Sequence, residues 1–259
     1  MGFMTPNTEL EGAVALVTGA SSGIGEAAAL ALAERGAAVA IAARRADRLE
    51  DLAKRIGDVG GAATAIEADV SQAEQAQAAV ERTVGELGRL DVLVNNAGVM
   101  LLGPAVGAPL EEWRRMVEVN ISGVLYCAHA AIPHLLRAAE DSPRRVADMV
   151  NVSSVAGRVV RSGSGVYNLT KHGVGAFSES LRQEVAGRHL RVSLVEPGAT
   201  DTELRSHNRP EIQESINRRF GGIQRLEAAD IADAIVYIVT RPWHVAINEL
   251  LVRPTEQEG

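Results

Sequence analysis

Short strand-like segments alternate with longer helical segments along almost the whole chain, and this alternation limits the possible folds more than any other feature. Several of the strand-like segments are continuous apolar runs, which is typical of parallel strands buried on both faces. The predicted strands are Val14–Thr18, Ala38–Ala42, Ala63–Glu67, Val92–Asn95, Ala147–Val152, Arg191–Val195 and Asn248–Val252. The predicted helices are Ile24–Arg35, Asp47–Ile56, Gln72–Leu87, Leu110–Ala139 (broken in places) and Val166–Gly187. This pattern predicts an α/β fold of the Rossmann type, with a doubly wound parallel seven-stranded sheet and helices on both faces.

The whole chain, 1–259, is predicted to form a single domain. No linker rich in Pro, Gly or Ser divides it, and its composition does not change along its length. One segment, about 199–222, is polar and interrupts the alternation. It is either a loop that covers the substrate or a solvated helical excursion, and the sequence favours neither.

Charge and composition exclude several classes of function. The net charge of −7 and the aromatic content of 3% argue against a nucleic-acid partner. Cys127 is the only cysteine, which excludes a disulfide scaffold and makes a metal site unexpected. No apolar run approaches the roughly 18 residues of a membrane span, and 1–11 do not resemble a signal peptide. We therefore expect a cytoplasmic protein with no membrane partner and no metal.

A glycine-rich turn follows the first predicted strand. Thr18–Gly25 reads TGASSGIG and leads directly into an Ala/Leu-rich helix. Glycines at 19, 23 and 25 would let the backbone approach a pyrophosphate at the start of that helix. A glycine turn without a ligand is the alternative, but the position between strand and helix favours a dinucleotide site. The residues predicted to bind the cofactor here are Gly19, Ser21, Ser22, Gly23, Ile24 and Gly25.

The end of the second strand indicates which dinucleotide binds. Proteins of this fold that bind NAD carry an acidic residue near this point, which holds the ribose 2′-hydroxyl. Here Ala43 stands in that place and Arg44 and Arg45 follow. Arginine pairs well with phosphate, so these residues favour NADP(H). A solvated start of the next helix is the alternative interpretation.

Two further turns follow the third and fourth strands. Asp69 and Val70 come after the third strand, and Asn96, Ala97 and Gly98 come after the fourth. The carboxyl ends of parallel strands lie at one edge of the sheet, where ligands bind in such folds. We therefore predict that both turns contact the cofactor, although each turn alone is a common motif.

A possible catalytic group is centred on Tyr167 and Lys171, which are four residues apart and share one helix face. A neighbouring ammonium group is expected to lower the pKa of a tyrosine, which is ordinarily near 10. Ser154 follows a predicted strand and could stabilise a substrate oxygen. Asn120 lies in a helical stretch and is expected to disturb that helix and to hold a water that leads to Lys171. Tyr167 and Lys171 alone could be an ordinary surface pair.

Taken together, these motifs resemble the short-chain dehydrogenase/reductase family, in its NADP-preferring form, from Gly12 to about Arg253. The resemblance implies that Tyr167 donates the proton in carbonyl reduction and that Lys171, Ser154 and Asn120 complete a tetrad. It implies that Tyr167 and Lys171 also contact the cofactor. The residues that it places around the nicotinamide are Pro197, Gly198, Thr200 and Thr202.

The expected function is therefore an NADP(H)-dependent oxidoreductase that reduces an aldehyde or ketone to an alcohol, or runs the reverse reaction. The alternatives are an NAD-linked alcohol dehydrogenase and a non-catalytic NADP-binding sensor. The family resemblance also implies a homotetramer or homodimer, joined through the helices around 120–139 and 166–187.

Some segments have a finer resemblance. They resemble both clavulanic acid dehydrogenase-like reductases, which would suggest secondary metabolism, and broad-specificity reductases of hydroxy acids and ketones. These segments are Val39–Leu49, Asn95–Pro104, Phe177–Val185 and Glu196–Arg205. The chain departs from the first group around 139–145 and through 207–219. The residues expected to form either an apolar pocket wall or ordinary core are Met100, Leu101, Leu102, Val155 and Val160.

Overall fold

Seven parallel strands form one sheet in the order β3-β2-β1-β4-β5-β6-β7 in the computed structural model, which describes residues 9–258. The strands are β1 Val14–Thr18, β2 Ala38–Ala43, β3 Ala62–Glu67, β4 Val92–Asn95, β5 Ala147–Val152, β6 Leu190–Pro197 and β7 Glu249–Val252. The order reverses direction at β1, so the chain winds outward in both directions from the β1–β4 pair. The prediction of a doubly wound parallel seven-stranded sheet is confirmed.

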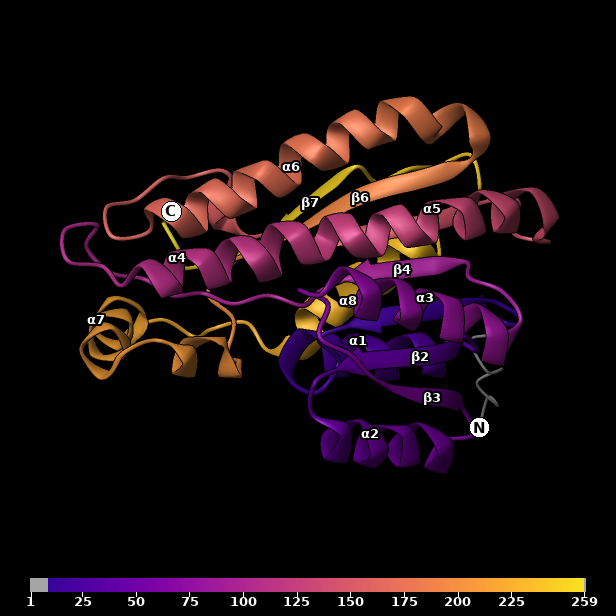
Figure 1. Cartoon of the computed structure of the whole chain (residues 1–259), viewed down its shortest axis with the longest axis horizontal. Coiled ribbons are helices and arrows are strands. Elements are labelled where there is room, and N and C mark those ends of the chain that lie inside the picture. The colour runs from indigo at the N-terminus through magenta and orange to yellow at the C-terminus, as the bar shows by residue number, and fades with distance from the viewer. Residues whose placement is uncertain (1–8, 259) are drawn as a thin grey trace.

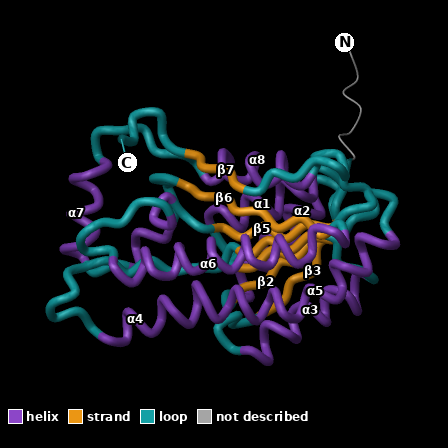
Figure 2. The backbone as a smooth tube through the Cα atoms, turned by 90° about the horizontal axis from the view of Figure 1, so that it is seen from above, coloured by secondary structure: helices purple, strands orange, loops and turns teal. Residues whose placement is uncertain are grey.

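Helices cover both faces of this sheet (Figures 1 and 2). The helices are α1 Gly23–Glu34, α2 Ala46–Asp58, α3 Ala73–Leu87, α4 Leu110–Val117, α5 Gly123–Asp141, α6 Gly165–Val185, α7 Pro210–Phe220 and α8 Ala228–Val239. One buried apolar cluster joins α1, α2 and α8 to the sheet, and a second joins α3, α5 and α6 to the other face. Because both faces are covered, β1, β5 and β6 are buried along their whole length.

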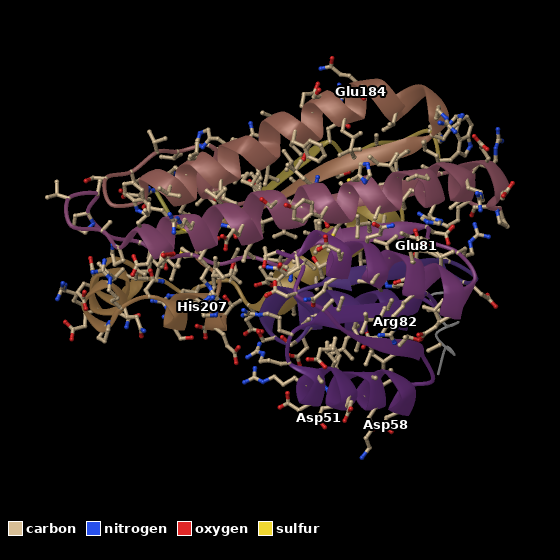
Figure 3. The ribbon with its side chains drawn as sticks, in the orientation of Figure 1. Asp51, Asp58, Glu81, Arg82, Glu184 and His207 are labelled. Atoms are coloured by element: carbon tan, nitrogen blue, oxygen red, sulfur yellow. The ribbon has the colours of Figure 1, made fainter. Side chains whose placement is uncertain are left out.

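Helix α2 shows how a local pattern fits these layers. Leu49, Leu52 and Ile56 are buried in the cluster beneath the helix. Asp51 and Asp58 point away from the sheet (Figure 3). The apolar spacing of three to four residues thus creates one buried face and one solvent-exposed face.

Helix α8 was not predicted from the sequence. It is apolar almost throughout, and seven of its residues are buried, among them Ile231, Ile235 and Val239. Its exposed face carries Asp230, Asp233 and Tyr237, but the apolar run 234–239 taken by itself could equally be a strand. Its start carries a local signal nevertheless, because Glu227 and Asp230 form a reciprocal capping box.

The predicted long helix is continuous but changes its winding at Glu118–Ser122, which forms a π-helix between α4 and α5. By length and composition Leu110–Asp141 could cross a membrane. The expectation that no apolar run approaches the length of a membrane span is therefore wrong for this segment. The buried side of α5 packs against the sheet, as in a core helix.

Segment 199–222 is largely helical, and whether it covers a substrate stays a prediction. A 3-10 helix, Glu203–His207, lines the cleft described below, and α7 follows it at the end of the molecule beyond the strand ends (Figure 1). We call residues 199–222 the lid.

Candidate active site

A cleft of about 400 Å³ opens at the carboxyl ends of the central strands. Its walls come from the turns after β1, β2, β3, β4, β5 and β6, from the start of α6, and from the lid. All the predicted site residues line this cleft except Gly25 and Asn120. Both of these pack against residues of the cleft wall.

The glycine loop leaves no room for side chains. Gly19 has φ +66°, and a Cβ there would lie 2.7 Å from the Ala97 Cα. A Cβ on Gly25 would lie 2.4 Å from the Asn96 amide nitrogen. Ser22, which precedes α1, does not cap that helix with its side chain. The first N–H groups of α1 therefore remain available to an anion, which fits a dinucleotide pyrophosphate.

Thr18 and Asn96 tie the turns after β1 and β4 together. The Thr18 hydroxyl accepts hydrogen bonds from the backbone N–H groups of Asn96 and Ala97, both at 3.1 Å. The Asn96 side chain donates to the Thr18 carbonyl at 3.0 Å. These bonds hold the two phosphate-side turns at a fixed separation.

Arg44 and Arg45 differ in their contacts. The Arg45 guanidinium donates to the Ser21 hydroxyl at 3.0 Å and to the Ser22 hydroxyl at 2.8 Å. Arg44 lines the same end of the cleft and is exposed, and within residues 9–258 no hydrogen bond or ion pair engages its side chain. One arginine is thus fixed to the glycine loop while the other is open to a ligand.

Tyr167 and Lys171 lie on the first turns of α6, and both are buried. Burial raises the pKa of Tyr167 to about 12, and a hydrogen bond with Ser154 opposes this rise. The pKa of Tyr167 is therefore raised overall, because loss of hydration dominates, and the lowering expected from Lys171 stays a prediction. Burial also lowers the pKa of Lys171 to about 8. Its ammonium donates to the Val152 carbonyl at 2.9 Å, and it lies 5.8 Å from the Tyr167 ring centroid.

Asn120 lies in the π-helix, as the predicted disturbance of the helix implies. Its side chain donates to the Val99 carbonyl at 2.9 Å and accepts from the Val99 N–H at 2.8 Å. It also donates to the Thr170 hydroxyl at 3.2 Å. The extra residue of the π-turn thus supports a side chain that joins the turn after β4 to α6, beside Lys171. The water expected between Asn120 and Lys171 stays a prediction.

Among the cleft residues that were not predicted, three hold parts of the site together. Asn168 donates to the carbonyls of Ala156 and Val159 at 2.6 and 2.9 Å and so holds the segment after Ser154. Gln257 accepts from the Ala199 N–H at 2.8 Å. Glu203, on the lid, pairs with Arg45 at 2.9 Å. Only Asn168 carries a local signal, since it adjoins Tyr167 on a predicted helix.

The apolar wall of the cleft is close to the expected one. Met100, Leu102 and Val155 line it. Leu101 lines a neighbouring cavity instead, and Val160 is 73% exposed and lines neither. Val160 was therefore wrongly included, because the chain after Val159 turns outward before α6 begins.

Comparison with known proteins places this geometry in a family. A family model described as short chain dehydrogenase matches residues 13–213. The chain therefore belongs to the short-chain dehydrogenases and is an oxidoreductase. It is 40% identical over 255 residues to "Glycine betaine reductase ATRR" of Emericella nidulans. That match covers 97% of this chain but only 19% of the much longer relative.

Two solved structures resemble the chain over nearly its whole length. A closed form of serine dehydrogenase complexed with NADP+ superposes with a TM-score of 0.86 at 30% identity, covering 95% of this chain and 96% of that one. A 3-ketoacyl-(acyl-carrier-protein) reductase from Brucella melitensis, complexed with NADH, has a TM-score of 0.82 at 33% identity, with 94% and 97% covered. The similarity thus includes proteins with either cofactor.

Proposed function

We propose that the protein is an NADP(H)-dependent carbonyl reductase, which converts an aldehyde or ketone to an alcohol. The observation that supports this most is that Tyr167, Lys171 and Ser154 line one cleft with the uncapped start of α1. Bound NADPH would supply the hydride, while the chain supplies orientation and the proton.

In this proposal Tyr167 is the proton donor. With a pKa of about 12 the phenol is protonated at neutral pH, so it can hydrogen-bond a carbonyl oxygen and protonate it as negative charge develops. The Ser154 hydroxyl stabilises the same oxygen. Lys171 would contact the cofactor ribose and support the phenol electrostatically, and Asn120 positions the turn after β4.

The choice of NADP(H) follows from Ala43 and Arg44. Ala43 puts no carboxylate beside the adenosine ribose, and Arg44, which has no partner within the described part of the chain, is free to bind a 2′-phosphate. Serine dehydrogenase, one of the similar structures, holds NADP+. Because the similar reductase from Brucella melitensis is complexed with NADH, an NAD-linked alcohol dehydrogenase is the second candidate.

A turnover assay tests both parts of the proposal. Aldehydes and ketones are screened with NADPH and with NADH, and oxidation of the cofactor is followed by absorbance. The panel includes oxo acids, because Arg161 lines the cleft and no ion pair engages it in the described chain. We expect turnover with NADPH.

The variant Arg44→Ala tests the choice of cofactor. It should weaken the binding of NADPH by about ten- to hundredfold, which is the contribution of a charge-assisted hydrogen bond, and leave the binding of NADH nearly unchanged.

Two outcomes contradict this proposal. Equal use of the two cofactors by the unmodified protein would favour the NAD-linked alternative. Tight NADPH binding with no turnover of any compound would favour a non-catalytic sensor.

We also propose that the chain forms a homodimer or homotetramer through α5 and α6. These helices run side by side on one face of the sheet (Figures 1 and 2). Both carry exposed apolar side chains, including Leu125, Tyr126 and Leu169. A location in the cytoplasm stays a prediction from the sequence.

A further inference from the structure

The lid is joined to the cofactor-phosphate end of the cleft by one carboxylate. Glu203, the first residue of the lid's 3-10 helix, pairs with Arg45 at 2.9 Å and with Arg48 at 2.6 Å. These arginines lie at the start of α2, more than 150 residues away in sequence. Hydrogen bonds from Arg48 and Arg45 lower the pKa of the Glu203 carboxyl to about 2, so it is anionic at neutral pH.

The position of this carboxylate matters because of what else Arg45 contacts. The same guanidinium donates to Ser21 and Ser22 in the glycine loop, and all of these residues line the cleft. The backbone beside Glu203 is also close to this loop, since a Cβ on Gly23 would lie 3.1 Å from the Thr202 methyl carbon. Glu203 thus puts a negative charge among the cations and hydroxyls that would otherwise face a phosphate.

We propose that Glu203 is an internal competitor for the 2′-phosphate of the cofactor, and that the arriving phosphate displaces its carboxylate from Arg45. This inference rests on the proposed NADP(H) function. Glu203 is then a specificity-determining residue that lowers the affinity for the phosphorylated cofactor and leaves the other cofactor unaffected. Because Glu203 begins the 3-10 helix of the lid, its displacement also frees the part of the lid that contains His207. His207 lines the cleft, and Figure 3 shows it on the lid between α7 and the sheet.

The Glu203–Arg45 pair can be displaced because it is exposed. Exposed ion pairs contribute little to stability, since water competes for both partners. The Glu203 side chain is 41% exposed, so an incoming phosphate can reach Arg45 and replace the carboxylate. Two anions that share one guanidinium repel each other, and removal of one strengthens binding of the other.

The test uses two fragments that differ only in the phosphate, adenosine 2′,5′-bisphosphate and 5′-AMP. Their dissociation constants are measured by calorimetry on the unmodified protein and on Glu203→Gln. We expect Glu203→Gln to lower the dissociation constant of the bisphosphate by about three- to tenfold at low salt and to leave the dissociation constant of 5′-AMP unchanged. The matched control is Glu86→Gln, which removes an exposed partner of Arg82 on α3, far from the cleft.

Hydrogen exchange on the unmodified protein provides a second readout. The bisphosphate should increase amide exchange in 203–207, and 5′-AMP should not. Glu203→Gln should already show the faster exchange without a ligand. A purely electrostatic influence of Glu203 would not move this signal.

The outcomes separate this inference from the proposed function. If the unmodified protein binds both fragments equally, the NADP(H) assignment fails and the role of Glu203 fails with it. If the unmodified protein prefers the bisphosphate but Glu203→Gln does not tighten it, only the competitor role is overturned. Equal weakening of both fragments would show instead that Glu203 closes over any bound adenosine.

Discussion

The phenol of Tyr167 is where the proposed chemistry can be tested by the removal of one atom. Tyr167→Phe keeps the buried ring and deletes the hydroxyl, so the fold and cofactor binding should persist. Loss of a positioned acid should lower kcat by about 10²–10⁴-fold. Steady-state kinetics with the best compound from the screen would measure this change, with NADPH titration as the control for binding. A variant that keeps near-normal kcat would remove Tyr167 from the mechanism.

The buried ammonium of Lys171 should make stability depend on pH. Its pKa is about 8 in the folded protein and ordinarily near 10.4, so between these values the unfolded chain binds more protons. The free energy of unfolding should therefore gain up to about 3 kcal/mol from this group as pH rises through that window. Lys171→Met should abolish this contribution in urea unfolding measured from pH 7 to 10.

The matched control for that experiment is Lys54→Met. Lys54 is the only other lysine of the chain, and it is exposed on α2. The Lys54 variant should keep the pH dependence of the unmodified protein. If Lys171→Met and Lys54→Met gave the same curve as the unmodified protein, Lys171 would not carry a buried charge.

At the residue scale, the sequence predicts identities better than environments. The spacing of Tyr167, Lys171 and the glycine loop follows local rules, so these residues could be selected without a structure. The direction of the Tyr167 pKa shift could not be predicted, because it depends on burial by segments that are distant in sequence. The role of Glu203 could not be predicted either, because its partners Arg45 and Arg48 come from the other half of the chain.

At the scale of the elements, the strands were the easiest to predict. Apolar runs such as Val92–Asn95 and Ala147–Val152 match the structure to the residue. Helix α8 and lid helix α7 were missed, for opposite reasons. Helix α8 ends in the apolar run 234–239, which could equally be a strand, whereas α7 is mostly polar. Its three apolar residues Ile212, Ile216 and Phe220 are too few to distinguish a helix from a polar loop.

Asn168 provides a prediction at this scale, because it fastens the segment after β5 to α6. Asn168→Ala removes two buried donors to backbone carbonyls and leaves those carbonyls unpaired. The free energy of unfolding should fall by about 1–3 kcal/mol. Because Ser154 precedes the loosened segment, kcat/KM should fall as well. Urea unfolding and kinetics measure the two effects.

The control for this prediction is Asn248→Ala, since Asn248 is exposed just before β7. It should change neither quantity. Loss of stability without loss of kcat/KM in Asn168→Ala would mean that the segment is held in place by other contacts when substrate binds.

At the scale of the whole molecule, the sheet places all the site residues at one edge. Six successive strand ends deliver the glycine loop, the arginines, the two cofactor turns, Ser154 and the Pro197 turn to one cleft. This convergence was predictable, because parallel strands share the direction of their carboxyl ends. How the lid lies over the edge was not predictable, since it depends on side-chain contacts such as Glu203 with Arg45.

The outer face of α5 and α6 carries the last prediction. Leu169 is 65% exposed on α6, and Leu125 and Tyr126 are 40% and 36% exposed on α5. Burial of such side chains against a second copy is favourable, and a charge at the centre of that contact is costly. Leu169→Glu should therefore shift a dimer or tetramer toward monomer, as measured by light scattering after size-exclusion chromatography. Val59→Glu, which places the same charge at an exposed valine after α2, should leave the mass unchanged. A monomeric unmodified protein, or an assembly that tolerates Leu169→Glu, would show that these helices are not the interface.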